Sequence, residues 1–490
     1  METESKRIYT AADLAAAIIS IALGYIYIKF VLFNPVSLYI MLFNFAFGTL
    51  AIFYVKSSGR KIKQGHIVVI AAAFLLNCVY IISSNTFINF IGGTFGVMLG
   101  IYIFFISANG FGAFGNSFLA DLSRSVFSPF SAFGECMRVI VSNIKKKKQG
   151  RKIGYIFIGL IISLPVTFIC AGLLMSADDV FKNVMSRIVH FGLDEIIDFI
   201  IRFSFGIPVA SYLFGMLFTN VKGENSPSAE NPFPTHVLPV PVICSAVAPV
   251  CLLYAIFFIS HFTYLTSALF GSLHTDFSYA EYARQGFFEL CAVAFINLII
   301  VIFLNIFDKK NENNATSKAV KFFTLFIISS TIILIITALG KMLLYIDTYG
   351  LTRLRVYTSW FMVLLLLVFL VIAIRAFNEK LKVFKPLFAV FAVMIGLLCF
   401  GDVDGFIAGH NISAYQSGKF TEFDVSLFYN LSDTAVIRAI SLADDEKIGE
   451  QIRLYLQHKY DELNNLEFKR YNFESVRALK ALQNYYLPQA

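Results

Sequence analysis

Ionisable and polar residues gather at the ends of long apolar segments in the second half of the chain. The string YAEYARQGFFEL (279–290) places Glu281 and Glu289 eight residues apart, near one face of a helix, and Arg284 lies next to Glu281 on that helix. Ionisable groups at membrane depth are costly to bury and usually pair with one another. The complete set, called the polar cluster below, is Glu281, Arg284, Glu289, Lys341, Arg353, Arg355, Asp402, Asp404, His410 and Asn411.

Three kinds of chemistry fit the polar cluster. The residues form a buried salt-bridge network, or line a polar cavity for a substrate or ion, or make a catalytic centre with Asp402, Asp404 or His410 as the base. The opposing charges favour the network, because arginines that meet carboxylates leave no unpaired base. We therefore assign no catalytic residue, and the sequence favours a protein that is not an enzyme.

Metal and cofactor sites have little support in the sequence. His261, His274 and His410 fall on the same predicted side of the membrane, but their spacing matches no metal-ligand motif, and there is no HExxH or CxxC pattern. Of the seven cysteines, all but Cys136 lie inside apolar runs, which argues against a disulfide framework. No phosphate-binding glycine loop is present. We expect no metal and no cofactor.

Apolar segments of about 20 residues, the length that crosses a membrane, must position these residues. The chain of 490 residues is 57% hydrophobic and 15% charged, whereas soluble domains carry about 25% charge. Lipid offers no hydrogen-bond partner to the backbone, so such runs are helices. We predict an all-α, multi-span integral membrane bundle of about eleven helices, near 11–33, 36–55, 67–83, 87–107, 154–175, 196–219, 239–262, 286–307, 322–345, 356–375 and 386–401.

Basic residues between these segments predict the orientation. One set of gaps holds most of them, including Lys145–Lys148, whereas the alternate gaps hold only Lys182, Arg187, Arg284, Arg353 and Arg355. Because basic residues stay on the cytoplasmic side, the N-terminus is predicted inside, and an odd number of spans puts the C-terminus outside a bacterial plasma membrane. The pI of about 8.9 reflects this bias and does not indicate nucleic-acid binding.

The same pattern predicts four regions along the chain. They are a four-span region (1–107), a cytoplasmic amphipathic and basic segment (108–153), a seven-span membrane core (154–401) and an extracytoplasmic helical tail domain (402–490). The basic segment is expected on the inner leaflet, with Lys145, Lys146, Lys147 and Lys148 in contact with anionic lipid. The tail shows four short helical patterns, with an apolar stripe of Ile448, Ile452, Tyr455 and Leu456, and with predicted caps at Ser432 and Asp444.

Several strings in the second half of the chain resemble a family of bacterial multi-span membrane proteins, domain of unknown function 4173, with the related 4153 group. These strings are ADDVF (177–181), YAEYARQGFFEL (279–290), YGLTRLRVYT (349–358) and DVDGFIAGHNISAY (402–415). The resemblance covers roughly residues 150–440 and implies a membrane protein with an outward helical tail, but no reaction. It points to Glu281, Arg284, Glu289, Arg353, Arg355, Asp404 and Asn411 as a shared cluster, whereas His410 departs from the family's pattern.

Three functional hypotheses follow. The first is a non-enzymatic component of the cell envelope, a scaffold, sensor or regulator. The second is a transporter or flippase-like protein with an outward polar cavity lined by Glu281, Arg284, Glu289 and Lys341, which prolines inside the spans would support. The third is a membrane enzyme acting on a lipid-linked substrate. A wide cavity between the eighth, ninth and tenth spans would favour transport, and interlocked arginine–carboxylate pairs would favour the scaffold. The bilayer is the expected partner, and the sequence identifies no protein partner.

Overall fold

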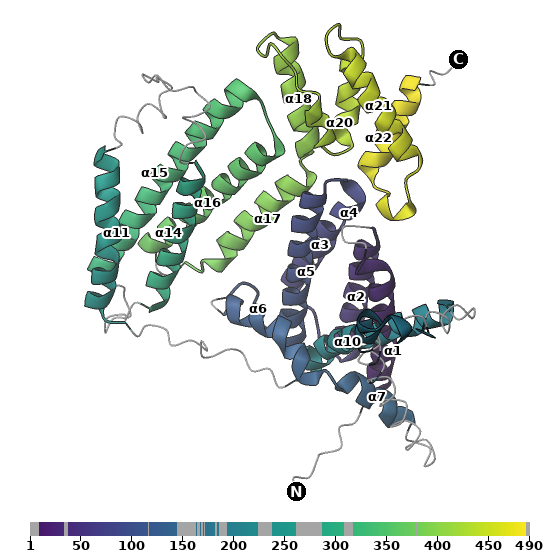
Figure 1. Ribbon diagram of the computed structural model, residues 1–490. Helices are drawn as coiled ribbons and strands as arrows, with labels where there is room; N and C mark the ends of the chain where they lie inside the picture. Colours follow the sequence, from purple (N-terminus) through teal and green to yellow (C-terminus); the bar gives the residue numbers. More distant parts are fainter. Residues whose placement is uncertain are drawn as a thin grey trace.

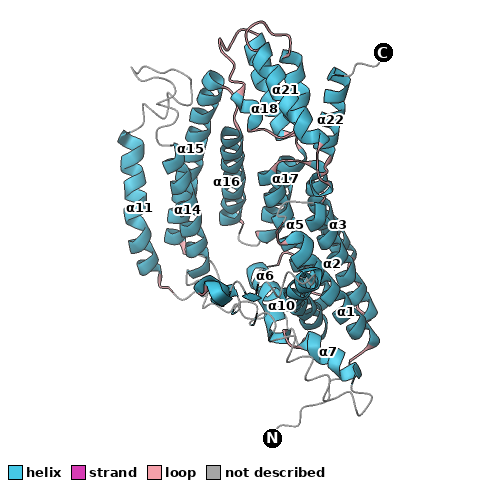
Figure 2. Cartoon of the chain, turned by 45° about the vertical axis from the view of Figure 1, so that its right-hand side comes forward, coloured by secondary structure: helices cyan, strands magenta, loops and turns pink. Residues whose placement is uncertain are grey.

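Every regular element that this computed structural model describes is a helix. The structure describes residues 9–33, 38–115, 117–144, 194–223, 238–260, 287–307, 317–378 and 381–486, together with short stretches between 163 and 185. Within these ranges the elements are helical throughout, as Figures 1 and 2 show, and this confirms the predicted all-α membrane bundle. Two groups of membrane helices lie side by side, and the tail domain packs on one end of them.

The first group contains the four predicted N-terminal spans and one later helix. Its members are α1 (Ala11–Ile26, continued by a π-helical turn at Tyr27–Val31), α2 (Leu38–Ser57), α3 (Gln64–Asn77), α4 (Val79–Ile82), α5 (Thr86–Asn109) and α10 (Asp194–Lys222). Helices α1 and α10 approach closely at Gly24 and Gly206, where a Cβ added to Gly24 would lie 2.2 Å from the carbonyl oxygen of Gly206. Small residues at a crossing let two membrane helices pack backbone to backbone.

A segment of short helices follows the first four spans. It comprises α6 (Phe118–Phe127), a 3-10 helix at Ser128–Ala132, and α7 (Glu135–Ile144). The 3-10 helix packs on α10, where the ring of Phe130 lies 5.2 Å from that of Tyr212. Leu119 and Phe127 on α6 remain exposed. The helical pattern predicted here is present, whereas Lys145–Lys148 lie outside the described residues.

The second group contains the later membrane helices of the described ranges. It consists of α11 (Val240–Ser260), α14 (Phe287–Phe307), α15 (Lys318–Tyr349), α16 (Arg353–Phe377) and α17 (Phe384–Phe400), and α17 also contacts α5 of the first group (Figure 1). Within the described ranges, eight helices are long and apolar enough to cross a membrane, and α17 with α18 makes a ninth candidate bent by 62°. Pro208 and Pro249 lie inside helices, as predicted. Most of the predicted span 154–175 is outside the described residues.

The tail is a helical unit with its own apolar core. Its elements are α18 (Val403–Gln416), α19 (Ser426–Tyr429), α20 (Thr434–Ala439), a 3-10 helix at Ile440–Leu442, α21 (Gly449–Asn464), a 3-10 helix at Phe468–Arg470, and α22 (Phe473–Tyr486). Ile452, Tyr455 and Leu456 are fully buried, as the stripe predicted.

The two predicted tail caps are wrong. The Ser432 hydroxyl lies 2.9 Å from that of Thr434, and α20 begins without a side-chain cap. Near the start of α21 it is Asp445, not Asp444, whose carboxylate accepts from backbone N–H groups, those of Lys447 (2.9 Å) and Ile448 (3.1 Å). Serine and aspartate are favoured both at helix starts and in turns, so their presence alone does not fix the position of a cap.

Candidate functional site

The centre of the site is a buried ion pair between two predicted residues, Arg353 and Asp404. Arg353 opens α16, and Asp404, which is 2% exposed, lies in the first turn of α18. The guanidinium binds both carboxylate oxygens, with Nε 2.8 Å from Oδ1 and Nη2 2.6 Å from Oδ2. Two parallel charge-assisted hydrogen bonds give a strong and geometrically specific pair.

Further donors complete the coordination of Asp404. The side-chain amide of Asn85 donates to Asp404 Oδ2 (2.7 Å), and the backbone N–H of Ser432 donates to the same oxygen (3.0 Å). Asn85 also donates to the hydroxyl of Tyr357 (2.7 Å). We call Asn85, Arg353, Tyr357, Asp404 and Ser432 the Asp404 junction, because they join the start of α5, the start of α16, α18 and the tail. A carboxylate whose oxygens are both engaged in this way is a poor general base.

A second network lies beside the Asp404 junction and holds helix α22. The backbone N–H and the hydroxyl of Ser84 both donate to Glu474 Oε2, at 2.8 and 3.1 Å. The same hydroxyl accepts from the backbone N–H of Asp433 (3.0 Å). Burial raises the pKa of Glu474 above its ordinary value, against the opposing effect of the hydrogen bonds from Ser84 and its neighbours. The loop between α4 and α5 therefore holds two separate parts of the tail.

Inside the tail the network continues through Lys459. Its ammonium group lies 3.2 Å from Asp433 Oδ1 and 2.9 Å from Glu462 Oε2, and the Ser475 hydroxyl donates to Asp433 Oδ2 at 2.6 Å. Burial lowers the pKa of Lys459, but the two carboxylates outweigh this effect and raise the pKa above its ordinary value. Lys459, Asp433 and Glu462 are therefore paired with one another.

Arg355 and Asn411, also predicted members of the cluster, hold the turn between α15 and α16. Arg355 Nη1 donates to the carbonyls of Tyr349 (2.9 Å) and Gly350, and its guanidinium lies 4.1 Å from the ring centre of Tyr345. The Asn411 side chain accepts from the N–H of Leu351 and donates to its carbonyl, both at 2.8 Å. These contacts satisfy backbone groups of the turn between α15 and α16.

Asp402 and His410 take local roles. Asp402 adopts a left-handed conformation (φ 44°) at the bend between α17 and α18, and its carboxylate caps α18 by accepting from Gly405 N–H (3.1 Å). His410 Nδ1 lies 3.4 Å from Asn411 Oδ1. The described residues contain no group of histidine, cysteine and carboxylate side chains that could hold a metal, and His261 and His274 lie outside them.

Two further members of the polar cluster, Glu289 and Lys341, are not part of the Asp404 junction. Glu289 on α14 is exposed, and the half-buried Lys341 on α15 is within range of its charge. Glu281 and Arg284 lie outside the described residues, so their predicted pairing stays a prediction. Among the described members, Arg353 and Asp404 belong to the Asp404 junction, and Arg355 and Asn411 hold the α15–α16 turn. Glu289 is close enough to Lys341 for their charges to interact.

Sequence reasoning missed a second buried charge, at the other end of the first helix group. Asp13 on α1 is 0% exposed, accepts from the hydroxyl of Tyr54 at 2.6 Å, and pairs with Lys222 of α10. A signal for Asp13 was present, because Thr10 and Asp13 form a capping box at the start of α1. The charge pattern of the sequence indicates only that Lys222 is one of the basic residues on the predicted cytoplasmic side.

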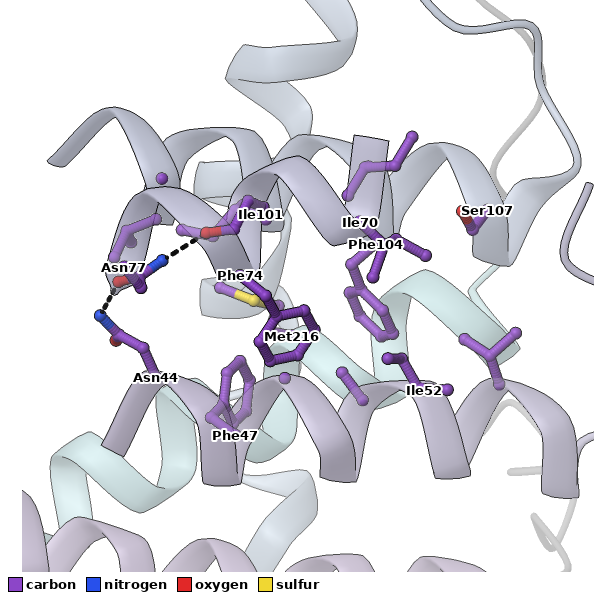
Figure 3. Close-up of a pocket in the computed structure, with 18 of the residues that line it drawn as sticks. Asn44, Phe47, Ile52, Ile70, Phe74, Asn77, Ile101, Phe104, Ser107 and Met216 are labelled. Atoms are coloured by element: carbon purple, nitrogen blue, oxygen red, sulfur yellow. Dashed lines mark hydrogen bonds between the residues drawn. The ribbon is translucent and has the colours of Figure 1, made fainter. Parts of the chain in front are cut away.

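A cavity of about 100 Å³ lies between α2, α3 and α5, as Figure 3 shows. Its wall is mostly apolar, with Phe47, Phe74 and Phe104 among its residues, and Asn44 donates to Asn77 Oδ1 at 2.6 Å at one end. An apolar wall of this kind offers no path to a polar solute. The cavity also lies in the first helix group, whereas the transport hypothesis placed one between the eighth, ninth and tenth predicted spans.

Comparison with protein families gives one match. Residues 15–442 match the family model described as "Domain of unknown function (DUF4153)". No curated protein and no solved structure matches the chain. The match begins within α1 and ends at the 3-10 helix that follows α20, so it includes every member of the Asp404 junction.

Proposed function

The chain belongs to the DUF4153 family, whose description names no activity, and from the geometry we propose that it is a non-enzymatic scaffold of the bacterial cell envelope. In this role its membrane helices hold the tail domain in a fixed position at the membrane surface. The observation that carries the proposal is the Asp404 junction, in which one buried carboxylate binds groups from both helix groups and from the tail.

The predicted orientation completes the proposal. The distribution of basic residues supports a cytoplasmic N-terminus and an extracytoplasmic tail in the plasma membrane. On the cytoplasmic side, Lys145–Lys148 follow α7 directly in the sequence and would attract anionic lipids. The scaffold would then contact lipid on one side and present a helical domain on the other.

The alternatives receive less support from the same contacts. An enzyme needs a base that is free to accept a proton, whereas both oxygens of Asp404 are engaged with donors. A transporter needs a polar route between helices, whereas the cavity of Figure 3 has an apolar wall, and a second cavity, with a polar wall, lies between the α4–α5 loop and the tail. Paired charges that join helices are what a scaffold requires.

The proposal can be tested by separating the position of the tail from the charges that hold it. In cells lacking the native gene, we would compare Arg353→Met, Asp404→Asn and the double variant for resistance to osmotic and detergent stress. Each single variant leaves a buried group without its partner and should lose function, whereas the uncharged double variant should keep the tail docked and restore most of it.

The outcome distinguishes a scaffold from chemistry at the junction. If the charges themselves bind or process a substrate, the double variant will be as defective as either single variant although its tail is docked. Docking would be measured directly, by protease resistance of the tail in isolated membranes. Ser329→Leu, a change at an exposed position on α15, serves as the control for expression and membrane insertion.

A further inference from the structure

A cavity of about 380 Å³ lies between the α4–α5 loop and the tail. The membrane side of its wall includes Ser83, Thr86 and Asn89, and the tail side includes Lys459 and Ser475. The volume is in the range of small-molecule binding sites, which is roughly 300–1,000 Å³. In contrast to the apolar cavity of Figure 3, its wall consists largely of hydroxyl, amide and charged side chains.

Four of the five described charged side chains on this wall already have partners, and Arg470 at the rim is the fifth. Arg353 is held by Asp404, and Lys459 is held by Asp433 and Glu462. A strongly charged ligand would have to break one of these pairs, and separating a buried pair is costly. The paired groups can still make further hydrogen bonds, because a carboxylate has about four acceptor positions and an ammonium group has three donors. The wall therefore suits a ligand that is uncharged and rich in hydrogen-bonding groups.

One buried group on the wall has hydrogen-bonding capacity that the described residues do not use. Asn89 is 4% exposed, and its amide nitrogen donates to the Ser83 carbonyl at 2.8 Å, but its carbonyl oxygen has no partner among the described residues. A buried polar atom without a partner is unfavourable unless a water molecule or a ligand supplies one. At the rim, the exposed guanidinium of Arg470 adds further donors.

We propose that this cavity binds a sugar. Sugar hydroxyls both donate and accept, so they can donate to Asp433, Glu462 and the free Asn89 oxygen while accepting from Lys459 and Arg470. The cavity lies where the spans end and the tail begins, so the sugar can belong to a soluble saccharide or to the headgroup of a glycolipid. This site goes beyond the scaffold role and does not require it, because tail docking and sugar binding are measured separately.

The test uses the full-length chain in nanodiscs without glycolipid. Saturation-transfer NMR would measure binding of maltose, cellobiose and N,N′-diacetylchitobiose, with inorganic pyrophosphate as the anionic probe. A second set of nanodiscs containing glucosyl-diacylglycerol distinguishes the lipid-borne source, because the lipid would displace the free disaccharide. Asn89→Leu should weaken binding by about five- to tenfold, the usual effect of losing one or two hydrogen bonds. Ser329→Leu should leave it unchanged.

Folding of the variants is checked separately by circular dichroism and by protease resistance of the tail. If Asn89→Leu does not fold, Arg470→Ala replaces it, because this side chain lies exposed at the rim. Saturable saccharide binding that falls in these variants supports the site. Binding of pyrophosphate alone, binding of no probe, or saccharide binding that neither variant changes would overturn the proposal. None of these results depends on the stress phenotype that tests the scaffold.

Discussion

At the scale of single residues, the decisive feature is that two buried carboxylates, Asp404 and Asp13, are each bound by several donors. Asp404 is bound by a guanidinium, an amide and a backbone N–H, and Asp13 by an ammonium group and a phenol. Desolvating a charge costs several kcal/mol, which such contacts must offset. These groups therefore stabilise the fold as pairs. Replacing one of them should destabilise the protein mainly because its partner then remains buried without a counter-charge.

The Asp404 pair gives a stability prediction. Asp404→Asn leaves Arg353 without its counter-charge and should lower the free energy of unfolding by about 3–5 kcal/mol. Adding Arg353→Met should recover a large part of this loss, because no buried charge then remains. Denaturation in mixed micelles would measure both values, and equal losses in the single and double variants would show that the pairing is not the cause.

Glu474 gives a prediction about pH. Its pKa is raised in the folded protein, so this group's contribution to stability is complete below the ordinary glutamate pKa and is lost as pH rises through the folded-state pKa. Glu474→Gln removes this dependence. Between about pH 4 and pH 8, protease resistance of the tail in the variant should improve relative to the native chain as pH rises. A constant difference across that range would contradict the assignment.

The single residues also show which parts of the site could be predicted from the sequence. Arg353 and Asp404 could be found because ionisable groups stand out at the ends of apolar runs. Their partners could not, because Asn85 and Ser432 are ordinary polar residues that become important only when segments distant in sequence meet. The sequence predicted one cluster because it could order residues along the membrane normal but could not place the helices around it.

At the scale of elements, the crossing of α1 and α10 depends on backbone contact. Gly24 and Gly206 face each other so closely that a single added carbon would meet the opposite chain. The long apolar runs in the sequence predicted both helices correctly, because hydropathy depends only on local sequence. Their pairing involves residues more than 180 positions apart, so periodicity gave no indication of it.

This crossing can be tested with a matched pair of substitutions. Gly24→Ala should destabilise the protein by about 1–3 kcal/mol, because the helices must separate to admit the methyl group. Gly100→Ala on α5 has no neighbouring atom within 4 Å of the added carbon and should stabilise the helix by about 0.5–1 kcal/mol. Unfolding in mixed micelles would compare them, and similar effects at both sites would exclude a close crossing.

At the scale of the whole molecule, the tail packs on one end of the membrane helices and contacts them through polar groups. Contacts with the α4–α5 loop and with α16 hold it, while α18 continues from α17 through the 62° bend. The position of the tail therefore depends on both helix groups, because a shift of either group moves a donor to Asp404.

Topology is the corresponding prediction. A cysteine introduced at the exposed Ser441 of the tail should react with a membrane-impermeant maleimide in intact cells, whereas one at the exposed Ser131, before α7, should react only after the cells are broken. The native chain provides the background signal. The reverse pattern would place the tail in the cytoplasm and would remove the basis for an envelope role.

The order of synthesis gives the Asp404 junction another meaning. Asn85 and Arg353 leave the ribosome before Asp404, and Ser432 follows later still, so this carboxylate can gather its donors only when the chain is nearly complete. Until then Arg353, at the membrane border, has no counter-ion. A polypeptide that ends before Asp404 would keep this arginine unpaired. Cellular proteases could then distinguish incomplete chains from complete ones by this unpaired charge.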